Sequence, residues 1–213
     1  DVFEHTRLAL ESFDAPQFAK VFSNQRPSVQ AIIATLLHDV GKPSTTKTPE
    51  RHADVGADIA KSIAERLKLS SYLGAVDANQ LHWLVKHHLV LRNGAAKDMR
   101  PSTIEYYFFS NPDLGRDLRM LYWVDGAATI RPNRPRFELK SYQALVDRVK
   151  KMGAKGNQLP KPIITGGEIM KILNLKPGPQ IGKILMDIRE AQLSGKVKTK
   201  AQALTLAKKQ AKA

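Results

Sequence analysis

Leu36-Leu37-His38-Asp39-Val40-Gly41-Lys42-Pro43 is the stretch that decides how this chain folds. It closes an apolar segment that begins near Val29, and we expect Gly41 and Pro43 to stop that helix just after its two polar residues. A buried charge without a partner costs on the order of several kcal/mol. The His-Asp pair therefore needs a hydrogen-bond network or a bound metal, and these two residues alone leave both open.

Composition limits the classes to which the protein can belong. Its 213 residues are 42% hydrophobic, which is enough to bury a sizeable core. No apolar run has the length of a membrane span and no signal peptide opens the chain, so we expect no membrane partner and a cytoplasmic location. The absence of cysteine excludes disulfides, thiolate metal sites and cysteine nucleophiles. The sequence starts inside an apparent helix, so we expect it to be part of a longer protein.

Positive charge is concentrated in the last third of the chain. Residues 140–213 carry 16 Lys and Arg against 4 Asp and Glu, which is +12 of the total net charge of +14. Such a segment indicates a polyanionic partner, most often a nucleic acid, although a solubilising tail has the same composition.

Hydrophobic periodicity predicts an all-α protein. Apolar residues recur at intervals of three and four, and no stretch alternates as a strand would. Residues 1–152 are expected to form one helical bundle. A Gly-, Lys- and Pro-rich linker follows at 153–163, and residues 164–213 are expected to form a small basic helical subdomain. The Thr165-x-x-Glu168 spacing predicts a capping box at its first helix.

Four ionisable side chains are expected to face the interior from different helices. His5 lies on the apolar side of the first helix, and His38 and Asp39 end the second core helix. Asp125 continues a stripe of leucines, so it should be buried against a positive group. Two imidazoles and two carboxylates suit Zn, Mn, Fe, Co or Ni better than Ca.

Three further histidines can serve a second ion. His52 begins a helix, where the helix dipole disfavours the protonated imidazole and so favours the neutral form that a metal requires. His87 and His88 lie near the end of another helix, and either can point inward. A single inward histidine is more often a core residue than a ligand, so the prediction depends on the whole set converging.

This order of His, His-Asp and Asp over several helices resembles the HD superfamily of metal-dependent phosphohydrolases. A narrower similarity covers nearly the whole chain. Its motifs are Asp1–Thr6, the Leu36–Pro43 stretch, Arg51–Ala57, Ile164–Ile169 and Leu175–Leu185, followed by Gln192–Gly195. They resemble the C-terminal two thirds of bacterial tRNA nucleotidyltransferases, the CCA-adding and poly(A) polymerase family.

The resemblance implies an HD-domain helical bundle with an RNA-binding tail, without the polymerase head of that family. The head needs a Gly-Ser turn and a nearby pair of aspartates on strands, and neither is found in this chain. Nucleotide addition is therefore not expected here, and an upstream head domain is an expected partner.

The predicted activity is metal-dependent hydrolysis of nucleotide or RNA-end phosphoesters, including 2′,3′-cyclic phosphates. One or two divalent ions, either a transition metal or Mg, are the expected cofactors, with Asp39 as the bridge between them. Lys42 can meet a phosphate oxygen as a point charge, and a solvated loop lysine is the alternative. Arg92 and Arg100 are weaker candidates for substrate contact.

The alternative function is a non-catalytic body that holds tRNA or other RNA. The residues expected to contact phosphates are Lys171, Lys176, Lys183, Arg189, Lys196, Lys198 and Lys200. The two functions are compatible, because an HD site can process the RNA end that the tail holds.

Overall fold

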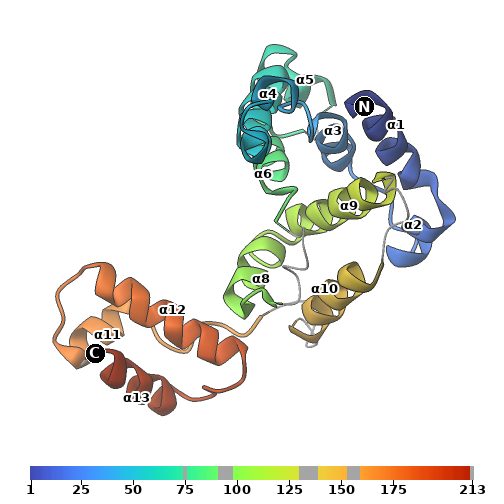
Figure 1. Cartoon of the computed structure of the whole chain (residues 1–213). Helices are drawn as coiled ribbons and strands as arrows, with labels where there is room; N and C mark the ends of the chain where they lie inside the picture. Colours follow the sequence, from blue (N-terminus) through green and yellow to red (C-terminus); the bar gives the residue numbers. More distant parts are fainter. Residues whose placement is uncertain (74–75, 91–97, 130–138, 153–158, 212–213) are drawn as a thin grey trace. The chain divides into compact units, whose positions relative to one another are not determined.

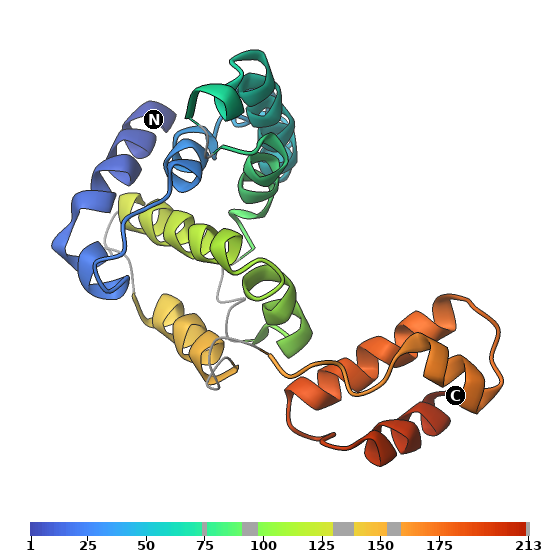
Figure 2. The same cartoon turned by 180° about the vertical axis from the view of Figure 1, so that it is seen from behind.

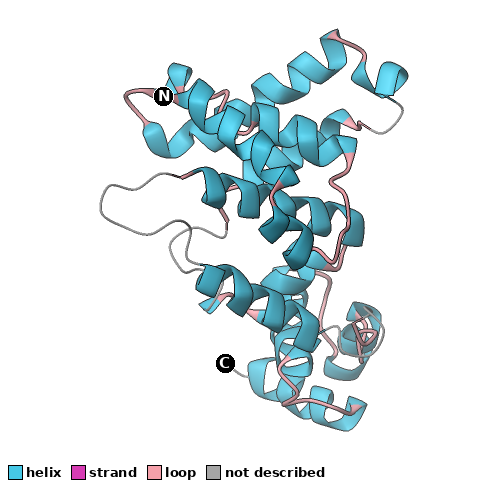
Figure 3. Cartoon of the chain, turned by 90° about the vertical axis from the view of Figure 1, so that its right-hand side faces the viewer, coloured by secondary structure: helices cyan, strands magenta, loops and turns pink. Residues whose placement is uncertain are grey.

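The computed structural model describes residues 1–73, 76–90, 98–129, 139–152 and 159–211. Within these ranges all regular structure is helical and no strand occurs (Figure 3). The all-α prediction is therefore confirmed. In this part of the chain no helix combines the length and the apolar character that a membrane crossing needs.

The chain divides into two compact units. The first unit consists of Asp1–Lys97 and Asn111–Leu145, and the second of Asp98–Ser110 and Val146–Ala213. This division differs from the predicted boundaries at 152 and 163, because residues 98–110 and 146–152 group with the C-terminal helices. The sequence could not show that these two stretches group with the C-terminal helices, because the grouping depends on contacts between residues far apart in the chain.

The first unit is organised around α9. Its helices are α1 (Val2–Glu11), α2 (Pro16–Val21), α3 (Val29–Leu37), α4 (His52–Arg66), α5 (Leu69–Leu73), α6 (Ala78–His87) and α9 (Pro112–Ala128), with the beginning of α10 (Leu139–Met152) (Figure 1). α1, α3 and α6 all contact α9, and α4 packs along α6, as the opposite view also shows (Figure 2). Polar residues on these helices can therefore meet beside α9.

Aromatic side chains fill the part of the first unit around α2 and α9. The Phe18 ring lies 5.4 Å from Trp123 and 4.5 Å from Phe22, measured between centroids. Tyr142 is buried and stacks on Tyr122 at 6.2 Å. These large apolar surfaces supply much of the hydrophobic stabilisation and hold α9 in place.

The end of α3 differs from the expectation in one respect. Ser28 caps the helix, and its hydroxyl accepts a hydrogen bond from the Ala31 N–H at 2.9 Å. α3 ends at Leu37, and turns lead to Pro43, where a short 3₁₀ helix begins. Gly41 does not terminate α3 through a left-handed conformation, because its φ is not positive. Gly41 instead allows this turn to approach the backbone of α4 closely.

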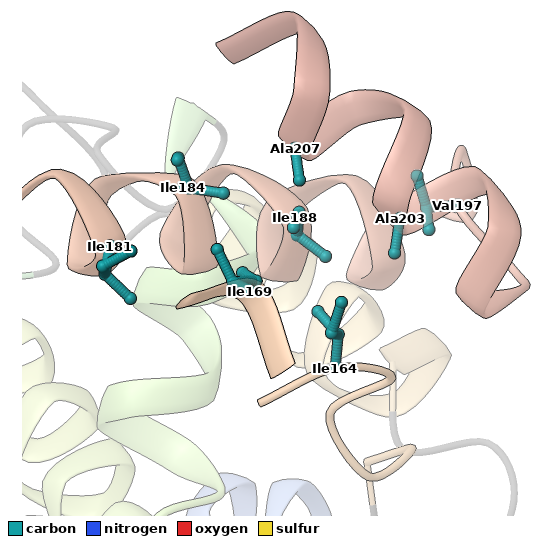
Figure 4. Packing of buried hydrophobic residues seen from close by; sticks show 8 residues of the cluster. All are labelled: Ile164, Ile169, Ile181, Ile184, Ile188, Val197, Ala203 and Ala207. Carbon is teal, nitrogen blue, oxygen red and sulfur yellow. The ribbon is translucent and has the colours of Figure 1, made fainter. Parts of the chain in front are cut away.

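The second unit has its own core. It contains α8 (Pro101–Phe108), the end of α10, α11 (Gly166–Leu173), α12 (Pro179–Leu193) and α13 (Lys200–Ala211). The predicted capping box of Thr165 and Glu168 is present at the start of α11. The buried side chains that hold its last three helices together are Ile164, Ile169, Ile181, Ile184, Ile188, Val197, Ala203 and Ala207 (Figure 4).

Candidate metal centre

Six side chains from five separate segments converge inside the first unit. They are His5 of α1, His38 and Asp39 after α3, His52 of α4, His88 after α6 and Asp125 of α9. All but His5 are buried, and the His5 side chain is 17% exposed. The structure thus brings together the residues that the sequence pattern selected, His88 being the member of the His87–His88 pair that enters the cluster.

One group of ligand atoms surrounds the side of the cluster near α1 and α9. His5 Nε2 lies 3.0 Å from Asp125 Oδ1 and 3.3 Å from His38 Nε2. Asp39 Oδ2 lies 3.3 Å from His38 Nε2 and 3.7 Å from His5 Nε2. These four side chains supply two imidazole nitrogens and two carboxylates around one point.

A second group lies on the other side of Asp39. Its Oδ1 atom is 3.6 Å from His52 Nε2 and 3.8 Å from His88 Nε2. Because Oδ2 faces His5 and His38 while Oδ1 faces His52 and His88, the single carboxylate of Asp39 belongs to both groups. A carboxylate placed in this way offers one oxygen to each group.

Backbone carbonyls fix the orientation of the three buried imidazoles. The Nδ1–H groups of His38, His52 and His88 donate to the carbonyl oxygens of Thr35, Pro49 and Val85 at 2.7, 2.6 and 2.6 Å. A carbonyl can only accept, so Nδ1 carries the proton in each ring. Each Nε2 atom is therefore free to offer its lone pair to the cluster when the ring is neutral.

The residues fit divalent cations. Asp39 Oδ1, His52 Nε2 and His88 Nε2 are buried and have no hydrogen-bond partner, although such atoms normally have one. Two atoms that bind one ion at about 2.1 Å lie roughly 3.0–3.4 Å apart. Three of the separations in the first group, 3.0, 3.3 and 3.3 Å, fall in this range, and those of the second group, 3.6 and 3.8 Å, exceed it by a few tenths of an ångström. The nitrogen and oxygen donors suit transition metals, and the identity of the ion stays open.

Burial and charge set the protonation of the cluster without metal. Burial disfavours the protonated form of His38, but Asp125 and Asp39 outweigh it and raise its pKa to about 9. Asp39 is buried too, yet its contacts with His38 and Lys42 hold its pKa well below the usual range. For His88 burial dominates, and with the nearby charge of His38 it lowers the pKa to about 4. The two ligand groups therefore differ in charge, with a proton at His38 and a neutral imidazole at His88.

Lys42 lies at the rim of the cluster. Its ammonium group contacts Asp39 Oδ2, and its side chain is 36% exposed, whereas that of Asp39 is 1% exposed. Lys42 therefore places a positive charge against the buried carboxylate while part of its own side chain remains in contact with solvent. Arg100 precedes α8 in the second unit, and Arg92 lies outside the described residues.

His87 does not join the cluster. Its Nδ1–H donates to the carbonyl of Trp83 at 2.7 Å, and its ring packs on the Trp83 indole at 4.6 Å. It is half-buried, and burial lowers its pKa. The sequence left His87 and His88 equivalent, because each continues one of two adjacent apolar strips of the same helical stretch.

The predicted RNA-contacting residues of the second unit fall into two kinds. Lys171, Lys176, Lys183, Lys196, Lys198 and Lys200 are exposed. Lys200 also pairs with Glu168. The Arg189 side chain is only 15% exposed, and its Nε–H donates to Glu105 at 2.9 Å. It also donates to the carbonyl of Pro160 at 2.7 Å, so the structure gives Arg189 a role inside the unit.

Sequence reasoning missed the glycine contact that places Asp39 near His52. A Cβ atom on Gly41 would lie 2.2 Å from the carbonyl oxygen of His52 and 2.6 Å from the Gly56 amide nitrogen. The sequence does contain both glycines, one two residues after the His-Asp pair and the other four residues after His52. Their contact could not be predicted from the sequence, because it forms only when the turn and α4 pack together in the fold.

The HD domain family matches residues 3–118, a span that includes all cluster residues except Asp125. The chain belongs to the HD-domain family. A second family, described as tRNA nucleotidyltransferase domain 2 (putative), matches residues 120–207 and therefore includes Asp125. Both parts of the predicted resemblance are thus confirmed.

Two named relatives are similar to this chain over most of its length. It is 30% identical to an A-adding tRNA nucleotidyltransferase of Deinococcus radiodurans, over 95% of this chain and 45% of that protein. It is 31% identical to a CC-adding tRNA nucleotidyltransferase of Thermus thermophilus, over 82% of this chain and 38% of that protein. The chain thus spans less than half of either relative.

A shorter similarity reaches a different class of enzyme. A bifunctional uridylyltransferase/uridylyl-removing enzyme of Ruegeria pomeroyi is 42% identical over 65 residues, which is 30% of this chain and 6% of that protein. No solved structure matches the chain.

Proposed function

We propose that this chain is a metal-dependent phosphohydrolase that acts on nucleotide or RNA-end phosphoesters, 2′,3′-cyclic phosphates among them, and that it works in association with tRNA. The observation that carries the proposal is the position of Asp39 between two sets of imidazoles, together with three buried atoms that have no hydrogen-bond partner, Asp39 Oδ1, His52 Nε2 and His88 Nε2. Membership of the HD-domain family supports the same activity.

His5, His38, Asp39 and Asp125 would hold one divalent ion, and Asp39, His52 and His88 a second. Bound ions at these positions would activate a water molecule and neutralise charge on the phosphoryl group. Asp39 would contribute one carboxylate oxygen to each ion, Oδ2 to the first and Oδ1 to the second. Because the backbone carbonyls of Thr35, Pro49 and Val85 hold the imidazoles, little rearrangement of the ligands would accompany binding.

Lys42 would bind the phosphate of the substrate. In the structure its ammonium group neutralises Asp39 Oδ2, and its exposure at the rim leaves room for rotation toward solvent. When a cation takes over the charge of Asp39, the lysine becomes available for a phosphate oxygen. Its charge would then orient the ester and favour the more negative transition state.

The activity can be tested with Mn²⁺, Co²⁺, Ni²⁺ or Mg²⁺ and the generic diester bis(p-nitrophenyl) phosphate. The wild-type chain should hydrolyse it, and Asp39→Asn should lower the rate by more than about 100-fold, since it removes a ligand from both ions. Asp58→Asn is the matched control, because that carboxylate is 81% exposed on the same unit. Equal rates for wild type and Asp39→Asn would refute the hydrolase.

A second candidate function is a non-catalytic RNA-binding body, because both long relatives are named as tRNA nucleotidyltransferases. The +12 charge of residues 140–213 and the exposed lysines of the second unit support RNA binding in either case. A chain that binds tRNA with steep salt dependence and no metal-dependent turnover would favour this function over the hydrolase.

A further inference from the structure

Two glycines form the closest approach between the turn that carries Asp39 and the helix that carries His52. Gly41 lies two residues after Asp39, and Gly56 lies one turn into α4 after His52. Both are buried. A Cβ atom on Gly41 would meet the His52 carbonyl oxygen at 2.2 Å, the Gly56 amide nitrogen at 2.6 Å and the Gly56 Cα at 2.9 Å. All three are backbone atoms, so no side-chain rotation can relieve the clash.

The same contact extends to α6. A Cβ atom on Gly56 would lie 3.2 Å from the Gly41 amide nitrogen and 3.5 Å from Val85 Cγ1. The carbonyl oxygen of Val85 accepts the Nδ1–H of His88. The two glycines thus lie where the segments that carry Asp39, His52 and His88 meet, which are the three ligands of the second group.

The first ligand group depends on other contacts. His5 comes from α1 and Asp125 from α9, and His5 Nε2 meets Asp125 Oδ1 and His38 Nε2 directly. None of these three residues lies on α4. A displacement of α4 from the turn would therefore separate His52 from Asp39 and leave His5, His38, Asp39 and Asp125 together.

The size of the displacement decides the outcome. Nonbonded carbon contacts ordinarily lie at about 3.5–4.0 Å, whereas the Cβ of an alanine at position 41 would start 2.2 Å from a backbone oxygen. The turn and α4 would have to separate by about 1 Å, while metal–ligand distances tolerate roughly 0.2 Å. The second group would lose its geometry even if the fold absorbed the change.

We propose that the Gly41–Gly56 contact is the positioning device for the second cation position, and that it decides whether this chain holds two divalent ions or one. The inference rests on the metal-binding part of the proposed function. Both glycines act by setting the distance between the backbone of the Asp39 turn and that of the helix that carries His52.

The test measures ions per chain rather than activity. Wild type, Gly41→Ala and Gly182→Ala are loaded with Mn²⁺ and desalted, and bound manganese is measured by elemental analysis and by the EPR signal of two coupled ions. Gly182 is the matched control, because a Cβ there would meet nothing within 4 Å. Wild type and Gly182→Ala should hold two coupled ions, and Gly41→Ala should hold one without the coupled signal.

Gly56→Ala provides a milder version of the same change. Its closest contact would be 3.2 Å, so it should fold and bind the second ion at least tenfold more weakly than wild type, as measured by Mn²⁺ titration. Alanine is the better helix former, so thermal unfolding of the metal-free variant should not show a matching loss. A purely structural role would instead lower stability without changing the stoichiometry.

The outcomes separate this inference from the function on which it rests. If wild type binds no ion, the proposed function fails together with the inference. If wild type binds two ions and both Gly41→Ala and Gly56→Ala bind two with unchanged affinity and coupling, only the inference is overturned.

Discussion

The Nδ1–H of His88 donates to the carbonyl oxygen of Val85 at 2.6 Å. His38 and His52 make the same contact, each with a carbonyl three residues earlier in the chain. Three histidines on three segments are thus oriented by their own local backbone, with Nε2 directed toward Asp39 in each case.

Adjacent histidines provide a direct test of the second ligand group. His88→Gln removes an imidazole that faces Asp39 Oδ1, so the chain should lose one of two bound ions. His87→Gln should keep both, because His87 is turned toward Trp83. Elemental analysis of the purified variants after loading with Co²⁺ gives the comparison. Loss of an ion from the His87 variant with retention in the His88 variant would contradict the arrangement.

Stability of the metal-free protein should have its optimum near pH 6.5. The folded pKa of His38 is raised to about 9, so its contribution is complete below the unfolded value of about 6.5 and is lost as the pH rises through about 9. The folded pKa of His88 is lowered to about 4, so its contribution is complete above about 6.5 and is lost as the pH falls toward 4. Urea unfolding with a chelator across this range measures both limbs.

His88→Gln separates the two limbs. It should flatten the decline on the acid side and leave the decline on the alkaline side, which His38 causes. Added Mn²⁺ should reverse the alkaline decline, because a cation replaces the proton at higher pH. A variant that declines on the acid side as steeply as wild type would show that another group is responsible.

Several members of the cluster could be predicted from sequence because they interrupt an apolar helical pattern, whereas His52 was predicted from its place at a helix start and from the resemblance to the HD superfamily. Asp125 follows three leucines at helical spacing, and His38 and Asp39 end a core helix, so their inward direction follows from periodicity. His87 and His88 could not be separated, since both lie in the apolar region at the end of α6, His87 as its last residue and His88 directly after it. The Gly41–Gly56 contact is a tertiary relation between two backbones, which no local pattern encodes.

The basic segment shows a different limit of sequence reasoning. Arg189 and Lys183 belong to the same helix and look alike in composition, yet Arg189 is paired with Glu105 from a helix about 80 residues earlier. Charge counts predict the sign of the partner for the whole segment. They do not separate the cations that face solvent from those that hold the unit together.

Ser28 should matter to the first unit more than an ordinary helix cap. Its hydroxyl donates to Asp117 Oδ2 at 2.5 Å while it accepts from the Ala31 N–H. Asp117 is buried, and burial raises its pKa despite that hydrogen bond. Ser28→Ala should therefore cost the cap, about 1 kcal/mol, and about 1–3 kcal/mol more for the buried carboxylate, which would keep only its 3.4 Å contact with Arg116. Urea unfolding at neutral pH gives the total.

Asn111 is the control for the cap alone. It caps α9 by accepting from the Leu114 N–H at 3.1 Å, and it is exposed. Asn111→Ala should cost about 1 kcal/mol. The extra loss in Ser28→Ala should shrink at acid pH, where Asp117 becomes protonated in the folded state first. Equal losses for the two variants at neutral pH would show that Asp117 does not depend on Ser28.

Arg189 and Lys183 should respond in opposite ways to removal of their charge. Arg189→Met breaks the contacts with Glu105 and the Pro160 carbonyl, so it should destabilise the second unit by about 1.5–3 kcal/mol. Lys183 is exposed, so Lys183→Met should leave the thermal midpoint unchanged. The same change should weaken binding to tRNA, and the slope of the logarithm of the binding constant against the logarithm of salt concentration should fall by about 1, as expected for the loss of one phosphate contact. Thermal unfolding and filter binding over a range of salt concentrations measure both effects. If Arg189→Met leaves the midpoint unchanged and lowers the salt slope instead, Arg189 is a phosphate contact and not a structural residue.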